Sequence, residues 1–241
     1  MQIHIAPDYD QMSEQSVRAF LTALEGRTAP LVLLPSGKSP VGMLKGLREH
    51  FLAKGTRPDW HFIGLDEWVG IGQEVFGSCR EFLDRHLFKP LGIPEAQIHF
   101  FNGVATNLDA ERARAEALVA QHGRIVISVL GIGTNGHLGL NEPGSDPELR
   151  SQVTTLAPST IAAAKDYFDG PQTVTQGITL GLKTLLESEH VFLLASGRGK
   201  AEIIRQTVEG PVTRDVPASF LQSHTGCQLF LDTDAASALT T

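Results

Sequence analysis

Short apolar runs rich in β-branched residues alternate with amphipathic stretches of helical period along most of this chain. This alternation is the pattern of parallel strands joined by crossover helices, because parallel strands are buried on both faces and need long connections. We predict strands over 31–34, 61–65, 98–101, 125–130, 191–195 and 228–231. We predict helices over 11–24, 40–51, 78–88, 108–121, 159–168, 180–186 and 200–208. The expected fold is α/β, with an open, mostly parallel sheet flanked by helices in a Rossmann-like arrangement.

The 241 residues form one expected domain, 1–241, because no linker, repeat or low-complexity segment divides them. A chain of this length can bury one substantial core. Its last residues, 235–241, are small and polar enough that we expect them to fray.

Charge and cysteine usage exclude several classes of function. Lys and Arg number 20 against 27 Asp and Glu, a net charge of −7, so nothing attracts the chain generally to nucleic acid or anionic membranes. Cys79 and Cys227 lie far apart, which predicts neither a disulfide framework nor a zinc site. The start at 1–7 lacks a signal-peptide pattern, and no long apolar run follows, so we expect a cytoplasmic protein without a membrane anchor.

We expect functional residues in the loops after the predicted strands, because ligands of open α/β sheets bind beyond the carboxyl ends of the strands. The loop after 31–34 reads Pro35-Ser36-Gly37-Lys38-Ser39-Pro40. Its glycine, its hydroxyls and the helix start behind it suit a small phosphate, and a plain strand-to-helix connection is the alternative. A nucleotide P-loop is disfavoured, because Val32 stands where that motif needs its first glycine.

Two carboxylates, Asp66 and Glu67, follow the strand at 61–65 beside Trp68. Side chains alternate along an extended segment, so at most one of the two faces a site. The alternative is that both cap the next helix or lie in solvent.

A third loop, 130–144, contains five glycines interleaved with Asn135, His137, Asn141 and Glu142. A histidine within reach of a carboxylate can be held in one tautomer and transfer protons near neutral pH. The spacing Gly131-x-Gly133-x-x-Gly136 formally fits a dinucleotide fingerprint, yet Pro143 cuts short the helix that NAD binding requires. This loop therefore predicts acid–base chemistry.

Together these stretches resemble the glucosamine-6-phosphate deaminase/isomerase family, a relative of the 6-phosphogluconolactonases, over nearly the whole chain. The matching stretches are Ser36 to Pro40, Leu65 to Gly70, Gly133 to Pro143 and Gly197 to Lys200. Asn141-Glu142-Pro143 favours the deaminase branch, whereas 177–183 and 217–221 look most like galactosamine-6-phosphate isomerase members. The resemblance implies conversion of glucosamine or galactosamine 6-phosphate to a ketose 6-phosphate and ammonia, without metal or organic cofactor.

The resemblance also implies roles for single residues. Asp66 matches the base that moves a proton between C2 and C1, and His137 matches the ring-opening acid and base with Glu142 as its partner. Asn135 stands where some members carry an aspartate, so we expect a less favoured imidazolium here.

Phosphate recognition, by the same resemblance, falls on Ser36, Gly37, Lys38, Ser39 and Lys200. A second basic phosphate ligand belongs near the helix at 159–168, where Lys165 is available as a lid residue; a solvated helix lysine is the alternative. The competing activities are a sugar-phosphate lactonase, with His137 activating water, and a non-catalytic phosphosugar sensor.

The partner implied is a small amino-sugar phosphate, with no nucleic acid and no membrane. Hexameric members hold an activating sugar phosphate with basic residues, and the matching positions here are Gln152 and Thr154. Neutral side chains cannot supply charge-assisted phosphate contacts, so we expect no activation by a second sugar phosphate. We also expect a monomer or small homo-oligomer.

Overall fold

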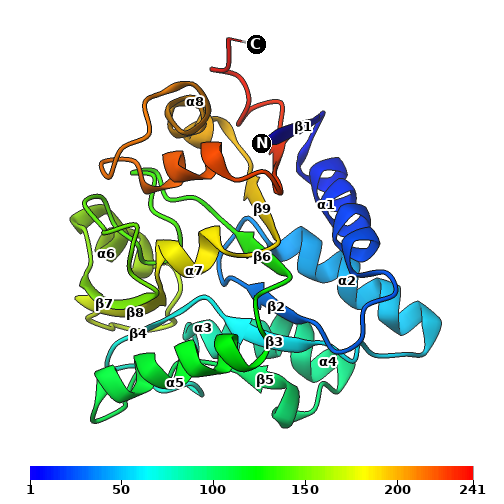
Figure 1. The fold of residues 1–241 in the computed structure, drawn as a ribbon, viewed down its shortest axis with the longest axis vertical. Helices are drawn as coiled ribbons and strands as arrows, with labels where there is room; N and C mark the ends of the chain where they lie inside the picture. Colours follow the sequence, from blue (N-terminus) through cyan, green and yellow to red (C-terminus); the bar gives the residue numbers. More distant parts are fainter. Residues whose placement is uncertain (241) are drawn as a thin grey trace.

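A computed structural model describes residues 1–240, and its centre is a seven-stranded sheet in the order β1-β10-β9-β6-β2-β3-β5 (Figure 1). Every neighbouring pair in this sheet is parallel. The strands are β1 (Gln2–Ala6), β2 (Leu31–Leu34), β3 (His61–Gly64), β5 (Ile98–His99), β6 (Ile127–Leu130), β9 (His190–Ala195) and β10 (Cys227–Asp232). The predicted parallel α/β fold is confirmed. The edge strand β1 was missed.

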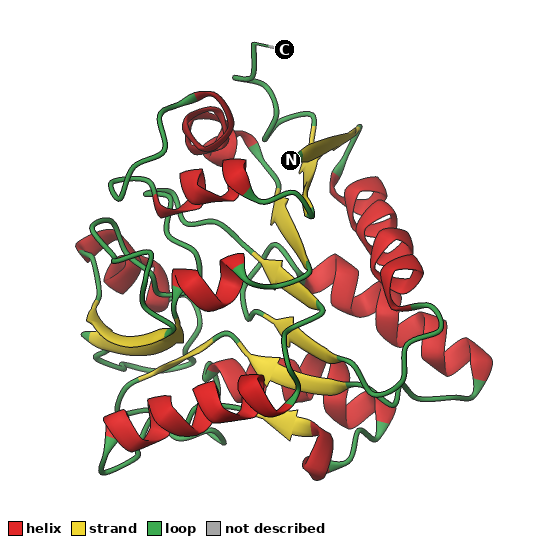
Figure 2. Ribbon diagram, viewed as in Figure 1, coloured by secondary structure: helices red, strands yellow, loops and turns green. Residues whose placement is uncertain are grey.

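Helices cover both faces of the sheet (Figure 2). They are α1 (Tyr9–Leu24), α2 (Val41–Lys54), α3 (Cys79–Leu83), α4 (Lys89–Leu91), α5 (Leu108–Gln121), α6 (Pro158–Ala164), α7 (Leu182–Leu186) and α8 (Ala201–Glu209). A π-helical turn at Asp84–Phe88 joins α3 to α4, and 3-10 turns occupy Glu95–Gln97, Arg198–Lys200 and Pro217–Ser223. Alternate residues of β2 divide between two cores, Val32 and Leu34 facing one and Leu31 and Leu33 the other.

A second, antiparallel sheet lies beside the carboxyl ends of the main strands, in the order β4-β8-β7. Its strands are β4 (Asp66–Trp68), β7 (Ser151–Thr155) and β8 (Gln176–Leu180). The chain runs from β3 through Leu65 directly into β4, so the residue after Leu65 belongs to the second sheet. The sequence did not predict β7 or β8, and the predicted helix at 180–186 begins only at Leu182.

The end of the described chain packs against the body of the protein. The Ala235 amide donates to Asp232 Oδ1 at 2.7 Å, Leu239 contacts a core cluster, and the Thr240 amide donates to Glu209 Oε1 at 2.7 Å. The structure thus gives residues 235–240 packing contacts, and their fraying in solution stays a prediction. Residue 241 lies outside the described part.

Among residues 1–240, no helix combines the length and the apolar character needed to cross a bilayer.

Candidate active site

The three loops singled out above meet around one cavity of about 310 Å³ at the carboxyl ends of β2, β3 and β6. The predicted site residues that line it are Ser36, Gly37, Lys38, Ser39, Asp66, His137 and Lys200. Asn135, Glu142 and Lys165 are outside the lining. The first two contact residues that lie on it, whereas the Lys165 side chain is exposed at the end of α6.

The loop 35–40 joins β2 to α2 and is held from outside by Tyr9. The Tyr9 hydroxyl lies 3.2 Å from the Lys38 carbonyl and 3.1 Å from the Ser39 carbonyl, and it accepts the Gly42 amide at 2.7 Å. Gly37 adopts a φ of 119°, a conformation that suits glycine. The loop is thus fixed with its glycine and serines on the cavity wall.

Asp66 begins β4 and its carboxylate is buried beside the cavity. The Cys79 thiol donates to Asp66 Oδ1 at 3.4 Å, and the Ser36 hydroxyl donates to the thiol sulfur at 3.2 Å. Burial raises the pKa of Asp66 to about 6, although the Cys79 hydrogen bond and the charge of His137 act in the opposite direction. A carboxyl with this pKa can give and take protons near neutral pH.

Glu67 points away from the cavity and organises the start of α3. Its carboxylate accepts the amides of Trp68 at 3.0 Å, Cys79 at 2.9 Å and Arg80 at 3.1 Å. Burial raises the pKa of Glu67 to about 7; its three amide donors oppose that shift, and the nearby Asp66 charge adds to it. As the strand alternation predicts, one of the two carboxylates faces the cavity.

The His137 ring lies flat against the glycine loop after β6. A Cβ on Gly133 would lie 2.4 to 2.6 Å from three atoms of this ring, so only glycine leaves room for it. The Gly133 amide donates to the His137 carbonyl at 3.1 Å, and Gly136 turns the chain with a φ of 84°. His137 Nδ1 lies 3.3 Å from Glu142 Oε2 and 3.3 Å from Thr160 Oγ1.

Glu142 is itself fixed by two further donors. Asn135 Nδ2 donates to Oε2 at 2.8 Å, and the Ala157 amide donates to Oε1 at 3.1 Å. Burial alone would raise the pKa of Glu142, but hydrogen bonds with His137, Thr160 and Asn135 outweigh it and lower the pKa to about 2. The carboxylate therefore stays ionised and holds the histidine ring in one orientation.

Lys200 stands opposite the phosphate-type loop, at the end of the 3-10 turn that leads into α8. Its ammonium donates to the Ile132 carbonyl at 2.7 Å, and burial lowers its pKa. Lys38, by contrast, has a side chain 80% exposed, and its Nζ lies 3.0 Å from Asp166 Oδ2. One ammonium thus lies inside the cavity and one at its rim.

The cavity lining also includes four residues that the sequence did not indicate: Cys79, Thr160, Asp166 and Tyr167. The sequence predicted only an ordinary thiol at Cys79, because no local pattern indicates its contact with Asp66, thirteen positions earlier. Tyr167 and Asp166 line the cavity where the sequence offered Lys165, since α6 ends at Ala164 rather than near Phe168.

Sequence comparison finds similar proteins over nearly the whole chain. The profile of the family described as Glucosamine-6-phosphate isomerases/6-phosphogluconolactonase matches residues 9–230. Curated relatives include glucosamine-6-phosphate deaminase 2 of Bacillus subtilis, 37% identical over 99% of this chain and 98% of the relative. A glucosamine-6-phosphate deaminase of Streptococcus suis is 38% identical over 99% of this chain and 100% of the relative.

Solved structures share the fold as well as the sequence. A monomeric glucosamine-6-phosphate deaminase superposes with a TM-score of 0.95 at 30% identity, over 99% of this chain and 100% of the other. A 6-phosphogluconolactonase from Leishmania guyanensis reaches 0.80 at 21% identity over 100% and 99% of the two chains, which shows a common fold. The chain belongs to the glucosamine-6-phosphate isomerase/6-phosphogluconolactonase family.

Proposed function

We propose that this protein isomerises and deaminates a 2-amino-2-deoxyhexose 6-phosphate, with glucosamine 6-phosphate giving fructose 6-phosphate and ammonia. The observation that carries the proposal is the pairing, on one cavity wall, of a buried carboxyl of raised pKa with a histidine fixed by an ionised glutamate. The names of the 37% and 38% identical relatives support the same reaction.

His137 opens the sugar ring in this mechanism. Ring opening removes a proton from the anomeric hydroxyl and delivers one to the ring oxygen, which an imidazole can do when its orientation is fixed. Glu142 supplies that orientation through Nδ1, and Asn135 holds Glu142 in place. Asn135 therefore positions the carboxylate and adds no second charge beside the histidine.

Asp66 transfers the proton between carbons. Its carboxylate removes the proton from C2 of the open aldose and returns it to C1, while O1 gains a proton and the amino group loses one, which converts the 2-amino aldose to a 1-hydroxy C2 imine. Water then adds to C2, and the C2–N bond breaks to release ammonia and the ketose. The pKa of about 6 suits this role, because the carboxylate must be ionised to begin and protonated halfway.

The 6-phosphate is assigned to the loop Ser36 to Ser39 and to Lys200 across the cavity. The serines and loop amides donate hydrogen bonds, and the Lys200 ammonium supplies the charge. Lys38 closes the rim with Asp166. Lys165 plays no part in this assignment, because its side chain is exposed outside the cavity lining.

The test is to assay the purified protein side by side with glucosamine 6-phosphate, galactosamine 6-phosphate and 6-phosphogluconolactone. We expect ammonia from glucosamine 6-phosphate, a smaller or comparable rate with the C4 epimer, and little lactone hydrolysis. Rapid lactone hydrolysis without ammonia would show that the chain is a lactonase, and ligand binding without turnover would show a sensor.

Two variants test the assigned roles. Asp66→Asn should lose at least about a hundredfold in kcat and abolish exchange of the C2 hydrogen with solvent. The His137→Gln variant should have a much lower rate on the cyclic substrate. Its rate should fall far less in the reverse reaction from ketose and ammonia, provided that the assay does not depend on closure of the sugar ring. Retained C2 exchange in the first variant, or equal impairment in both directions in the second, would contradict these roles.

A further inference from the structure

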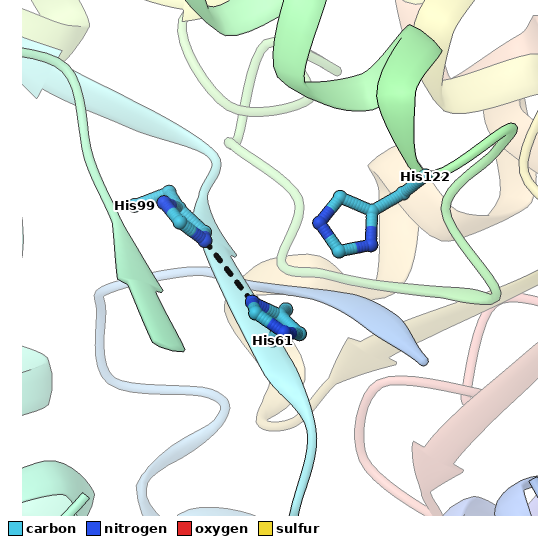
Figure 3. A group of neighbouring side chains, drawn as sticks. All are labelled: His61, His99 and His122. Atoms are coloured by element: carbon cyan, nitrogen blue, oxygen red, sulfur yellow. Dashed lines mark hydrogen bonds between the residues drawn. The ribbon is translucent and has the colours of Figure 1, made fainter. Parts of the chain in front are cut away.

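Three histidines gather at the end of the sheet opposite the catalytic cavity, and neither the fold nor the proposed reaction requires them. They are His61, His99 and His122, and each offers a ring nitrogen within 4.8 Å of those of the other two (Figure 3). His61 is the first residue of β3, whereas the cavity begins at Leu65, roughly 13 Å further along the strand. In residues 1–240 this is the one such group of three or more side chains able to ligate a metal.

The fold explains why residues so distant in sequence meet. In the parallel pairing of β3 with β5, Ile63 is opposite His99, so His61 and His99 project from the same face of the sheet. Helix α5 covers that face, and His122 is the residue that caps its carboxyl end. Two ligands are thus anchored on neighbouring strands, and the third comes from a helix end, as Figure 3 shows.

The separations suit a small metal ion. His61 Nδ1 lies 3.2 Å from His99 Nε2, and two imidazole nitrogens on one tetrahedral metal at about 2.0–2.1 Å are about 3.3–3.4 Å apart. The ring of His122 lies 4.7 Å from that of His61 between centroids, and one of its nitrogens lies within 4.8 Å of the ligand atoms of the other two histidines. The three rings are half-buried, so solvent can reach a fourth ligand position.

The surroundings favour neutral imidazoles. Burial lowers the pKa of His99 and His122, and the neighbouring histidines lower them further; Arg114 also lowers that of His99, whereas Glu95 raises it. The Glu95 carboxylate is engaged by Arg80 through both oxygens. Among the described residues, the only hydrogen bond of the three rings is the one between His61 Nδ1 and His99 Nε2, so no group outside the cluster competes with a metal for these nitrogens.

We propose that His61, His99 and His122 form a binding site for a borderline divalent transition metal such as Zn²⁺, with water as the fourth ligand. Three imidazoles select Zn²⁺, Co²⁺, Ni²⁺ or Cu²⁺ over Mg²⁺ and Ca²⁺, which prefer oxygen ligands. No carboxylate orients these rings, so the expected dissociation constant is on the order of micromolar rather than nanomolar. A bound ion cross-links β3, β5 and the end of α5.

The experiment is zinc titration calorimetry on chelator-treated protein, with wild type and three single-histidine variants compared under the same conditions. Wild type and His190→Gln, a half-buried strand histidine elsewhere in the sheet, should bind one Zn²⁺ per chain equally well. His122→Gln and His99→Gln should bind at least tenfold more weakly, with unchanged far-ultraviolet circular dichroism. If one of these two fails to fold, the other decides.

Co²⁺ provides an independent readout, because its visible absorption distinguishes tetrahedral from octahedral coordination. We expect tetrahedral bands in wild type that are lost in His122→Gln, and no competition from millimolar Mg²⁺. At zinc concentrations about a hundredfold above the dissociation constant, the melting temperature should rise by roughly 5–10 °C in wild type and not in His122→Gln.

Two results would overturn the proposal. One is the absence of binding heat in wild type at 100 μM protein. The other is equal affinity in wild type and both cluster variants, which would place the zinc elsewhere, with the catalytic cavity and its Cys79, Asp66 and His137 the first place to look. Failure of the proposed deaminase reaction leaves this test intact, since no arm depends on turnover.

Discussion

The Asp66 carboxyl depends on one neighbour, Cys79, for its only direct side-chain hydrogen bond among the described residues. That bond holds the pKa of Asp66 lower than burial alone would leave it. The Cys79 thiol is itself buried, which raises its own pKa well above the usual range, so it remains a neutral donor at physiological pH. The cysteine is therefore a positioning residue for the proposed base.

This arrangement predicts the pH dependence of a Cys79→Ala variant. Wild-type kcat/KM should fall as the pH drops through about 6, because Asp66 becomes protonated and can no longer accept the C2 proton. Removing the thiol donor raises the pKa of Asp66, so the acid limb should move to higher pH. Cys79→Ser keeps a donor and is the matched control. Identical acid limbs in wild type and Cys79→Ala would contradict the role of the thiol.

Lys200 is the charged group that we assign to the substrate phosphate. A charge-assisted hydrogen bond contributes about 1.5–3 kcal/mol, so Lys200→Ala should raise KM by about one to two powers of ten. Lys165→Ala, which removes an exposed lysine outside the cavity lining, should leave KM unchanged. Steady-state kinetics of both variants decides, and an unchanged KM in Lys200→Ala would show that the lysine only anchors the Ile132 carbonyl.

At the scale of whole elements, the glycine loop after β6 determines where the His137 ring can lie. An alanine at Gly133 would place a methyl group 2.4 to 2.6 Å from ring atoms, so Gly133→Ala must displace the ring from Glu142. We expect kcat to fall at least about tenfold while the fold is kept. Gly170→Ala, where an added Cβ meets no atom within 4 Å, is the control. Equal kcat in the two variants would show that the ring position does not matter.

The sequence predicted the elements whose signal is local. Buried parallel strands such as 191–195 and the loop containing His137 carry their pattern within a few residues, and both are where we expected them. Strands β7 and β8 carry no such local pattern: the side chains of β7 are mostly half-buried, and the buried residues of β8 include Gly177 and Thr179. Their strand structure comes from the antiparallel pairing of β8 with β4 on one side and with β7 on the other.

The site residues, too, were predictable only where their signal lies in a short local segment. Asp66 and His137 were found, because each follows a strand that ends at the cavity. Cys79 and Thr160 could not be found, since their places beside Asp66 and His137 come from packing of α3 and α6 against loops more than ten residues away. The three histidines of Figure 3 escaped for the same reason.

For the whole molecule, built from chains of 26.0 kDa, we predict a monomer or small homo-oligomer with hyperbolic kinetics. Gln152, which we expected from the resemblance to replace a basic activator-binding residue, donates to Asn141 Oδ1 at 2.7 Å and to Ser145 Oγ at 3.0 Å. The Gln152 amide is neutral and already donates hydrogen bonds to the loop before β7, so it cannot supply a charge-assisted contact to a phosphate. Light scattering and initial rates test this, and sigmoidal rates relieved by N-acetylglucosamine 6-phosphate would contradict it.

The placement of the two tryptophans allows ligand binding in the cavity to be followed by intrinsic fluorescence. Trp68 lines the cavity with its ring 6.1 Å from that of Tyr167 and 6.3 Å from that of Phe168, in the segment that follows α6. Trp60 is buried in the core against Phe20 and Phe51, away from the cavity lining.

A Trp60→Phe variant therefore carries a single fluorophore whose emission reports on the cavity and on the segment after α6. Addition of fructose 6-phosphate should shift or quench this emission with saturation, and inorganic phosphate should produce a weaker change of the same sign. The dissociation constant obtained in this way should match the product-inhibition constant from kinetics. Emission that stays constant at saturating product would show that neither the indole nor its aromatic neighbours respond when the cavity fills.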